Sequence, residues 1–230
     1  MEKRRHPCQF SPEVLDVVRD FIDPGEHVHD PYAGPGLRLG RLCDRLGARF
    51  TGTDIEDWGN LPDGRDERVR VADARDPAGY PPSPFTVVTS PVYFNKRCAD
   101  YPNGATRNTN DKGRRDYGIA LGRALHAENF ARHTGRPRHA DRYWQGHADA
   151  LRNWGHRVIV NVDEPIFLGW HRLLSDAGYH FTVTVPVRTR RYGGLANAER
   201  RAEFEVVILA VRQRNWHDST TNNKGDPYAR

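Results

Sequence analysis

The chain has 230 residues, 37% of them hydrophobic, and a mean hydropathy of −0.80, which fits one domain or one domain with an elaborated insertion. No run approaches eighteen apolar residues and the first residues lack the apolar stretch of a secretory signal, so neither a membrane span nor secretion is expected. Cys8, Cys43 and Cys98 form neither a disulfide framework nor a zinc pattern, so we expect a reducing cytoplasm and no metal. The net charge of +5 favours a polyanionic partner, although an arginine-rich coding composition explains the same charge without one.

The first half of the chain reads as alternating helices and strands. Ser11 fits a helix N-cap and Pro12 the first helical position, which needs no amide donor, and apolar residues recur at helical spacing as far as Ile22. A second helix is expected at 37–46, ending at Gly47. Short apolar runs predict strands at 27–30, 50–53, 69–72 and 85–89.

The second half begins with a polar stretch, from residue 96 to about 139, that has little apolar periodicity and is expected to be a surface insertion or a partly ordered lobe. Two β-rich runs near the end, joined by an arginine- and glycine-rich loop at 188–202, predict an antiparallel hairpin. Before them we expect a helix at 141–154, a strand at 157–162 and a helix at 164–177, and the hairpin strands at 180–187 and 203–211. The domain is therefore expected to span 1–211, with 96–140 inserted, and 212–230 to be a polar, disordered tail.

Two turns carry the strongest functional signal. Asp30-Pro31-Tyr32-Ala33-Gly34-Pro35-Gly36 and Thr89-Ser90-Pro91-Val92-Tyr93 each follow a predicted parallel strand. Each turn therefore lies at the carboxyl edge of an open α/β sheet, where such folds bind ligands. The first lets backbone approach a cofactor closely, and the second presents a hydroxyl, a carbonyl and an aromatic ring.

In this order and spacing the two turns resemble motifs I and IV of the S-adenosylmethionine-dependent amino-methyltransferases, which modify exocyclic amines of nucleic-acid bases. The segment 6–11 resembles motif X of the same family, and the likeness spans roughly residues 6–211. Segments 89–99 and 121–126 also look like a group of small methyltransferases from actinobacteria and their phages. The resemblance implies an α/β fold of class I (Rossmann-like): a seven-stranded, mostly parallel sheet that ends in an antiparallel hairpin.

The resemblance also implies S-adenosylmethionine as the cofactor. Asp54, at the end of the second strand, is expected to accept hydrogen bonds from the ribose hydroxyls, and Asp73, after the third, from the adenine amine. The expected cofactor-binding residues are Phe10, Ser11, Asp30, Tyr32, Ala33, Gly34, Gly36, Asp54, Ile55, Asp73 and Ala74. Dinucleotide binding is the competing interpretation, but it requires Gly-x-Gly-x-x-Gly, and Gly40 comes one residue too late.

The second turn is expected to be catalytic. Ser90 and the Pro91 carbonyl can accept the hydrogens of a poorly nucleophilic base amine, while Tyr93 stacks on a base swung out of its helix. The family pattern is (Asp/Asn/Ser)-Pro-Pro-(Tyr/Phe/Trp), and the serine favours cytosine N4 over adenine N6. Val92 replaces the second proline, so a protein that binds cofactor or DNA but turns over poorly is an open alternative.

Cations, amides and aromatic residues, including Tyr143 and Trp144, are interleaved after the catalytic turn, which favours nucleic-acid binding there. A solvated, flexible loop is the competing interpretation of the same residues. DNA is the preferred partner, and structured RNA is the alternative because a large, separate target-recognition domain is missing. The expected nucleic-acid-binding residues are Lys96, Arg97, Arg107, Arg114, Arg115, Arg188, Arg190 and Arg191.

Overall fold

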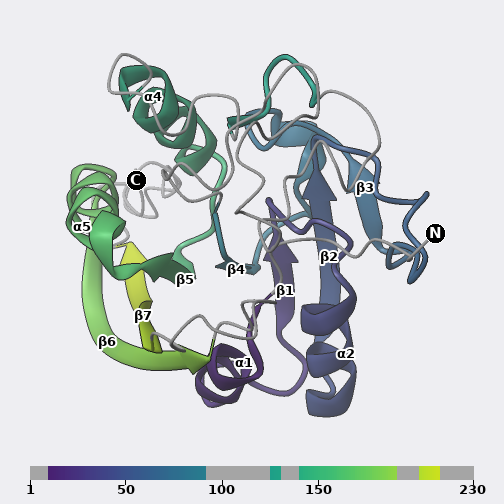
Figure 1. Cartoon of the computed structure of the whole chain (residues 1–230), viewed down its shortest axis with the longest axis horizontal. Coiled ribbons are helices and arrows are strands. Elements are labelled where there is room, and N and C mark those ends of the chain that lie inside the picture. Colours follow the sequence, from purple (N-terminus) through teal and green to yellow (C-terminus); the bar gives the residue numbers. More distant parts are fainter. Residues whose placement is uncertain (1–9, 92–124, 131–139, 191–201, 213–230) are drawn as a thin grey trace, which may run out of the picture.

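The computed structural model describes residues 10–91, 125–130, 140–190 and 202–212, and they contain a seven-stranded sheet (Figure 1). The strand order is β3-β2-β1-β4-β5-β7-β6, and all pairs are parallel except those that β7 makes with β5 and β6. The strands are β1 (His27–Asp30), β2 (Arg49–Asp54), β3 (Val69–Val71), β4 (Thr86–Thr89), β5 (Arg157–Asp163), β6 (Tyr179–Arg190) and β7 (Ala202–Arg212). This topology confirms the predicted α/β fold, a seven-stranded, mostly parallel sheet that ends in an antiparallel hairpin.

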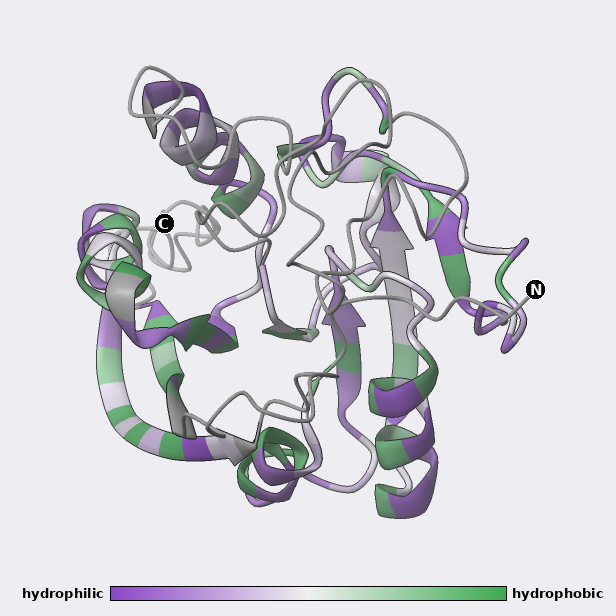
Figure 2. Cartoon of the chain, viewed as in Figure 1, coloured by the Kyte–Doolittle hydropathy of each residue, from purple (hydrophilic) through white to green (hydrophobic). Residues whose placement is uncertain are grey.

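Helices cover both faces of the sheet. The helices α1 (Pro12–Arg19) and α2 (Leu37–Leu46) share one hydrophobic core with the sheet, and α4 (Ala140–Leu151) and α5 (Phe167–Asp176) share another. Around α2, hydrophilic and hydrophobic residues alternate in bands (Figure 2), because Leu39, Leu42 and Cys43 are buried while its arginines are exposed. Short 3-10 helices lie at Pro77–Gly79 and Glu164–Ile166.

Strand β5 is buried on both faces of the sheet. Val158, Val160 and Val162 belong to the core under α4 and α5, whereas Ile159 belongs to the core under α1 and α2. Successive side chains of a strand point to opposite faces, so a central parallel strand must be apolar throughout. Asn161 interrupts this apolar run although it is only 1% exposed. Because buried polar side chains are normally hydrogen-bonded, we expect Asn161 to make a polar contact.

Several predicted boundaries differ from the structure. The helix α1 ends at Arg19 and α4 at Leu151, each three residues before the predicted end, and the predicted 164–177 helix begins as a 3-10 turn. The hairpin strands are longer than predicted, so Arg188 and Arg190 lie in β6 and not in a loop. The alternation of Val187 and Thr189, both buried, continues the strand pattern through these arginines.

The structure describes only residues 125–130 of the polar stretch that was predicted to be an insertion. Leu125, Asn129 and Phe130 are buried against the rest of the domain, and residues 92–124 and 131–139 lie outside the described part of the chain. The predicted tail after Arg212 lies outside it as well. No helix among the described residues is long and apolar enough to cross a membrane.

Candidate active site

The two functional turns leave the sheet side by side. Strands β1 and β4 are parallel neighbours, and the Thr89 hydroxyl at the end of β4 donates to Asp30 Oδ1 at the end of β1, over 2.6 Å. The same Asp30 oxygen accepts the Tyr32 backbone N–H at 3.0 Å, which closes the start of the glycine-rich turn. Asp30 therefore joins the turns predicted to bind cofactor and to catalyse.

Burial dominates the electrostatics of Asp30. Its side chain is 2% exposed, and this burial raises its pKa to about 7, against the opposing effect of the hydrogen bonds from Thr89 and Tyr32. Asp54 is perturbed in the same direction, because burial raises its pKa to about 6 even though it accepts the backbone N–H groups of Glu56 and Gly34. Both acids are thus held closer to neutrality than exposed aspartates.

The glycine-rich turn requires its glycines. Gly34 donates its N–H to Asp54 Oδ2 at 2.8 Å, which ties the turn to β2, and its φ is +56°. Gly36 has a φ of +68° and is the N-cap of α2, and a Cβ placed there would lie 2.5 Å from Val69 Cγ2. A left-handed backbone packed against β3 can be occupied only by glycine.

One cavity brings together the segments that resemble motifs X, I and IV. It encloses about 340 Å³, open to solvent. Its lining residues are Phe10, Asp30, Tyr32, Ala33, Gly36, Leu37, Arg38, Leu39 and Ser90. Ser11 is not among them: it caps α1, where its hydroxyl accepts the Val14 N–H at 3.2 Å. Arg38, which the sequence did not single out, donates to the Phe10 carbonyl at 2.7 Å.

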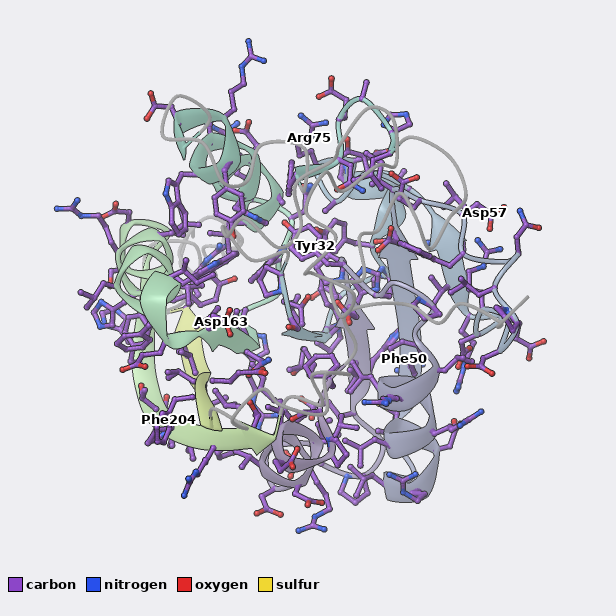
Figure 3. The ribbon with its side chains drawn as sticks, viewed as in Figure 1. Tyr32, Phe50, Asp57, Arg75, Asp163 and Phe204 are labelled. Atoms are coloured by element: carbon purple, nitrogen blue, oxygen red, sulfur yellow. The ribbon has the colours of Figure 1, made fainter. Side chains whose placement is uncertain are left out.

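A second cavity of about 370 Å³ holds most of the other predicted cofactor residues. It is lined by Pro31, Tyr32, Asp54, Ile55, Asp73, Ala74, Glu128, Asn129 and Phe130. Tyr32 borders both cavities, and Figure 3 shows it near the centre of the molecule. The Tyr32 hydroxyl is 2.9 Å from His147 Nδ1 on α4, so the turn is also anchored to the helical layer.

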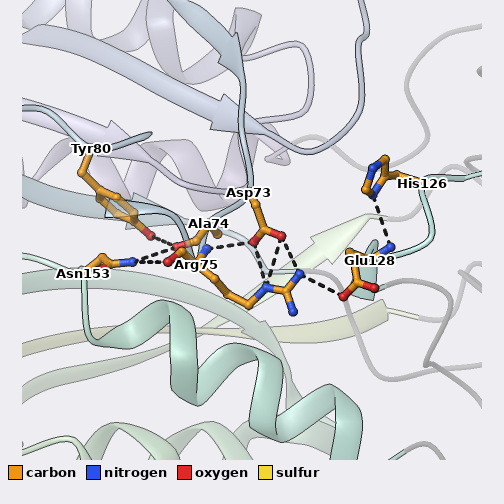
Figure 4. A network of polar contacts seen from close by, with 7 residues as sticks. All are labelled: Asp73, Ala74, Arg75, Tyr80, His126, Glu128 and Asn153. Atoms are coloured by element: carbon orange, nitrogen blue, oxygen red, sulfur yellow. Dashed lines mark hydrogen bonds and ion pairs between the residues drawn. The ribbon is translucent and has the colours of Figure 1, made fainter. Parts of the chain in front are cut away.

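Asp73 is already held by an arginine. Arg75 Nε donates to both Asp73 oxygens at 2.9 and 3.2 Å, and its Nη2 also reaches Glu128 Oε2 at 3.1 Å (Figure 4). Burial opposes ionisation of Asp73, but the hydrogen bonds from Arg75 outweigh it and lower the pKa of the carboxyl. Asp73 therefore meets the second cavity as a carboxylate shared with Arg75. The carbonyl of Ala74 accepts the Tyr80 hydroxyl at 2.7 Å.

Ser90 is supported from the neighbouring strand. Asn161 Nδ2 donates to Ser90 Oγ at 3.3 Å and to Glu205 Oε2 at 2.5 Å, and both Asn161 and Glu205 are buried. Pro91 is buried beside Ser90. The predicted residues Val92, Tyr93, Lys96, Arg97, Arg107, Arg114, Arg115 and Arg191 lie outside the described residues.

The structure changes the interpretation of Tyr143. Its side chain is fully buried, in edge contact with the rings of Trp144 and His147, so it belongs to the core and is not available to a nucleic acid. His147 is equally buried, and this burial lowers its pKa to about 3. The sequence pattern alone did not separate these core aromatic residues from surface ones.

Sequence reasoning also missed a group of residues around the second cavity: Glu56, Arg75, Glu128, Asn129 and Phe130. Arg75 and Glu56 each lie two residues after a predicted cofactor-binding aspartate, which was an available signal. The 128–130 segment had none, because it lies in a stretch without periodicity. Among the described residues, no group of three or more His, Cys, Asp or Glu side chains could hold a metal ion.

No protein-family model matches the chain, and no curated protein matches it. Solved structures with a similar fold include a magnesium protoporphyrin IX methyltransferase from Synechocystis PCC 6803 with bound S-adenosylmethionine, at 16% identity and a TM-score of 0.47 over 86% of this chain and 78% of that one. A proposed RNA methyltransferase from Pyrococcus horikoshii is 13% identical, with a TM-score of 0.48 over 93% and 89%. A TehB-like S-adenosylmethionine-dependent methyltransferase from Corynebacterium glutamicum is 15% identical, with a TM-score of 0.44 over 86% of each chain. The strand order, rather than these similarities, identifies the fold.

Proposed function

We propose that this chain is an S-adenosylmethionine-dependent methyltransferase that acts on an exocyclic amine of a DNA base, with cytosine N4 favoured over adenine N6. One observation supports this most: Phe10, Gly36 and Ser90, from the three segments that resemble motifs X, I and IV, line the same cavity. Motifs with a shared function must meet in space, and these three lie far apart in the sequence. The serine of the catalytic turn is the reason for preferring cytosine.

The residues around the two cavities fit the cofactor. At Gly36 a Cβ would overlap Val69, so the turn packs directly on β3, and the first turn of α2 carries no acidic residue, which suits a carboxylate at its N-terminus. Asp54 and Asp73, at the second cavity, supply the acceptors that ribose hydroxyls and an adenine amine need. We therefore assign the methionine half to the first cavity and the adenosine half to the second.

The proposed chemistry uses Ser90 and Pro91 as acceptors. When bound, the cofactor supplies a methyl group activated by its sulfonium. The Ser90 hydroxyl and the Pro91 carbonyl accept the two hydrogens of the base amine, which localises the nitrogen lone pair and directs it to the methyl group. The hydrogen bond from Asn161 holds the Ser90 side chain at the edge of the cavity, so the acceptor is positioned before the base arrives.

Labelling with the tritiated cofactor tests the proposal. The purified protein is incubated with host DNA and total RNA side by side, and host DNA from cells with and without the gene is sequenced by modification-sensitive long reads. We expect DNase-sensitive label and a new methylated motif. Label that resists DNase would move the substrate to RNA, and label in neither nucleic acid would overturn the proposal. If turnover is weak, Val92→Pro should raise it strongly, as expected for a protein limited by its departure from the family pattern.

Two variants should separate binding from catalysis. Ser90→Ala should lower the single-turnover methylation rate by roughly a hundred- to a thousandfold, the cost of one preorganised polar contact, and leave affinity for S-adenosylhomocysteine unchanged. Asp54→Ala should weaken that affinity. Thr51→Val is the control: it removes the hydroxyl that contacts His27 Nε2 and His29 Nδ1 within the sheet, each at 3.0 Å, and should change neither quantity. Equal loss of affinity in the Ser90 and Asp54 variants would contradict the assignment of the two sites.

A further inference from the structure

The wall of the second cavity is built from a distant piece of chain. Glu128, Asn129 and Phe130 line this cavity together with Asp54 and Asp73, which precede them by more than fifty residues. Residues 125–130, here called the wall segment, contain no α-helix or strand, and backbone bonds such as Asn129 N–H to His126 carbonyl make only a local turn. Something outside the segment must therefore fix its position.

Glu56 supplies the polar part of that fixation, beside the ring contacts of Phe130 with Tyr32 and His147. Its side chain is 1% exposed, and Oε1 accepts the His126 backbone N–H at 2.6 Å and Asn129 Nδ2 at 2.9 Å. Its own backbone N–H donates to Asp54 Oδ1 at 2.9 Å. Glu56 thus links the wall segment, through its carboxylate, to the residue assigned to the ribose, through its backbone N–H. Burying a carboxylate is costly unless it is hydrogen-bonded, so this pair of contacts also explains why Glu56 is tolerated in the interior.

A second contact connects the same segment to the adenine end. Glu128 accepts Arg75 Nη2 at 3.1 Å, and Arg75 in turn holds Asp73 (Figure 4). Glu128 is more than half exposed, so its ion pair with Arg75 stabilises the position of the wall segment less than the Glu56 contacts do. The buried Glu56 contacts are therefore the stronger of the two attachments.

We infer that Glu56 is a positioning residue that clamps the wall segment over the adenosine half of the cofactor, although Glu56 itself is not among the residues lining either cavity described above. The inference rests on the proposed cofactor. It makes affinity for any adenosine-containing ligand depend on the Glu56–Asn129 hydrogen bond. It also predicts that the amino-acid half of the cofactor is irrelevant to the effect.

Calorimetric titration of the full-length chain tests this with two probes, S-adenosylhomocysteine and 5′-methylthioadenosine, which lacks the amino-acid group. Glu56→Ala should weaken both by the same factor, roughly tenfold, since it leaves the buried Asn129 amide and the partly buried His126 backbone N–H without their acceptor. Asn129→Asp should do likewise, because it sets a second carboxylate against Glu56. Glu56→Gln keeps an oxygen for both donors and should bind nearly as well as the wild type.

The double variant Glu56→Gln/Asn129→Asp gives the sharpest outcome. The glutamine oxygen can still accept from His126, and its amide can donate to the new aspartate, so the hydrogen bond is restored with donor and acceptor exchanged. Affinity should recover relative to Asn129→Asp alone, which would show that Glu56 and Asn129 act through their mutual hydrogen bond. If Glu56→Ala does not fold, the comparison of Asn129→Asp with the double variant tests the role of Glu56 by itself.

Asp57→Asn is the matched control, because Asp57 is the next residue, exposed at the outer edge of the molecule, and paired with Arg65 (Figure 3). It should bind both probes as the wild type does. A wild-type protein that binds neither probe would overturn the proposed function itself. If the wild type binds both probes and Asn129→Asp binds them with the same affinity, only the role of Glu56 is overturned. If the variants lose affinity for S-adenosylhomocysteine but not for 5′-methylthioadenosine, the adenosine assignment is overturned.

Discussion

Asp30 combines a structural role with a strongly perturbed acid. Its Oδ1 holds the backbone of the glycine-rich turn and the Thr89 hydroxyl, while burial raises its pKa from 3.8 to about 7. For an acid with a raised folded-state pKa, the stabilising form is the protonated one. The contribution of protonated Asp30 to the free energy of unfolding is complete below pH 4, where Asp30 of the unfolded chain is protonated too. This contribution is lost as the pH rises through about 7.

Asp30→Asn should remove this pH dependence while keeping an oxygen for both hydrogen bonds. The free energy of unfolding of the variant, minus that of the wild type, should grow on the order of 3 kcal/mol between pH 5 and pH 8, in favour of the variant. Urea unfolding at several pH values measures it, and the difference cancels the contribution of Asp54, which is present in both proteins. Parallel stability curves for the two proteins would show that Asp30 is ionised freely in the folded state.

At the scale of elements, the glycine-rich turn packs directly on β2. The Ala33 N–H donates to the Thr53 carbonyl at 3.0 Å, and a Cβ at Gly52 would come within 2.8 Å of Ala33 Cβ and 3.3 Å of the Asp30 carbonyl oxygen. An added methyl group there would push on the turn itself. We therefore expect the stability of the protein and the proposed cofactor binding to be coupled at Gly52.

Gly52→Ala should destabilise the protein by about 1–3 kcal/mol, the usual cost of overpacking, and should also weaken affinity for S-adenosylhomocysteine. Gly47→Ala is the comparison. Gly47 ends α2 in the left-handed conformation, with φ +70° and open space around it, so alanine there should cost about 1 kcal/mol of strain and leave cofactor affinity unchanged. Thermal unfolding and calorimetry together separate the two cases, and unaltered affinity in Gly52→Ala would contradict the coupling.

The elements that sequence could predict are those with a strong local pattern. The apolar runs that end at Asp30 and Thr89 located two strands, and the glycines and aspartates after them located most residues of the two cavities. The wall segment was not predictable, because its position depends on the buried contacts of Glu56, seventy residues away from His126. Arg188 was misplaced because an arginine on the exposed side of a strand looks like a loop residue when its buried neighbours are ignored.

At the scale of the whole molecule, both cavities lie on the carboxyl edge of the sheet, because Asp30, Asp54 and Ser90 end or follow parallel strands. A nucleic-acid substrate must therefore approach this edge. The opposite, amino edge carries exposed arginines as well, including Arg45 at the end of α2 and Arg49 at the start of β2. Net charge alone does not distinguish the two edges, so the test must compare arginines at each.

Salt dependence of binding makes that comparison. Each phosphate neutralised by a cation contributes about −0.9 to the slope of log affinity against log salt for duplex DNA. Replacing Arg114 and Arg115 together by alanine should therefore make the slope shallower by about 2, since we expect both to contact phosphates after the catalytic turn. The Arg45→Ala/Arg49→Ala variant removes the same charge from the amino edge and should keep the wild-type slope. Fluorescence anisotropy of a labelled duplex between low and moderate salt measures all three proteins. Equal changes in both variants would mean that net charge, and not a surface beside Ser90, governs the interaction.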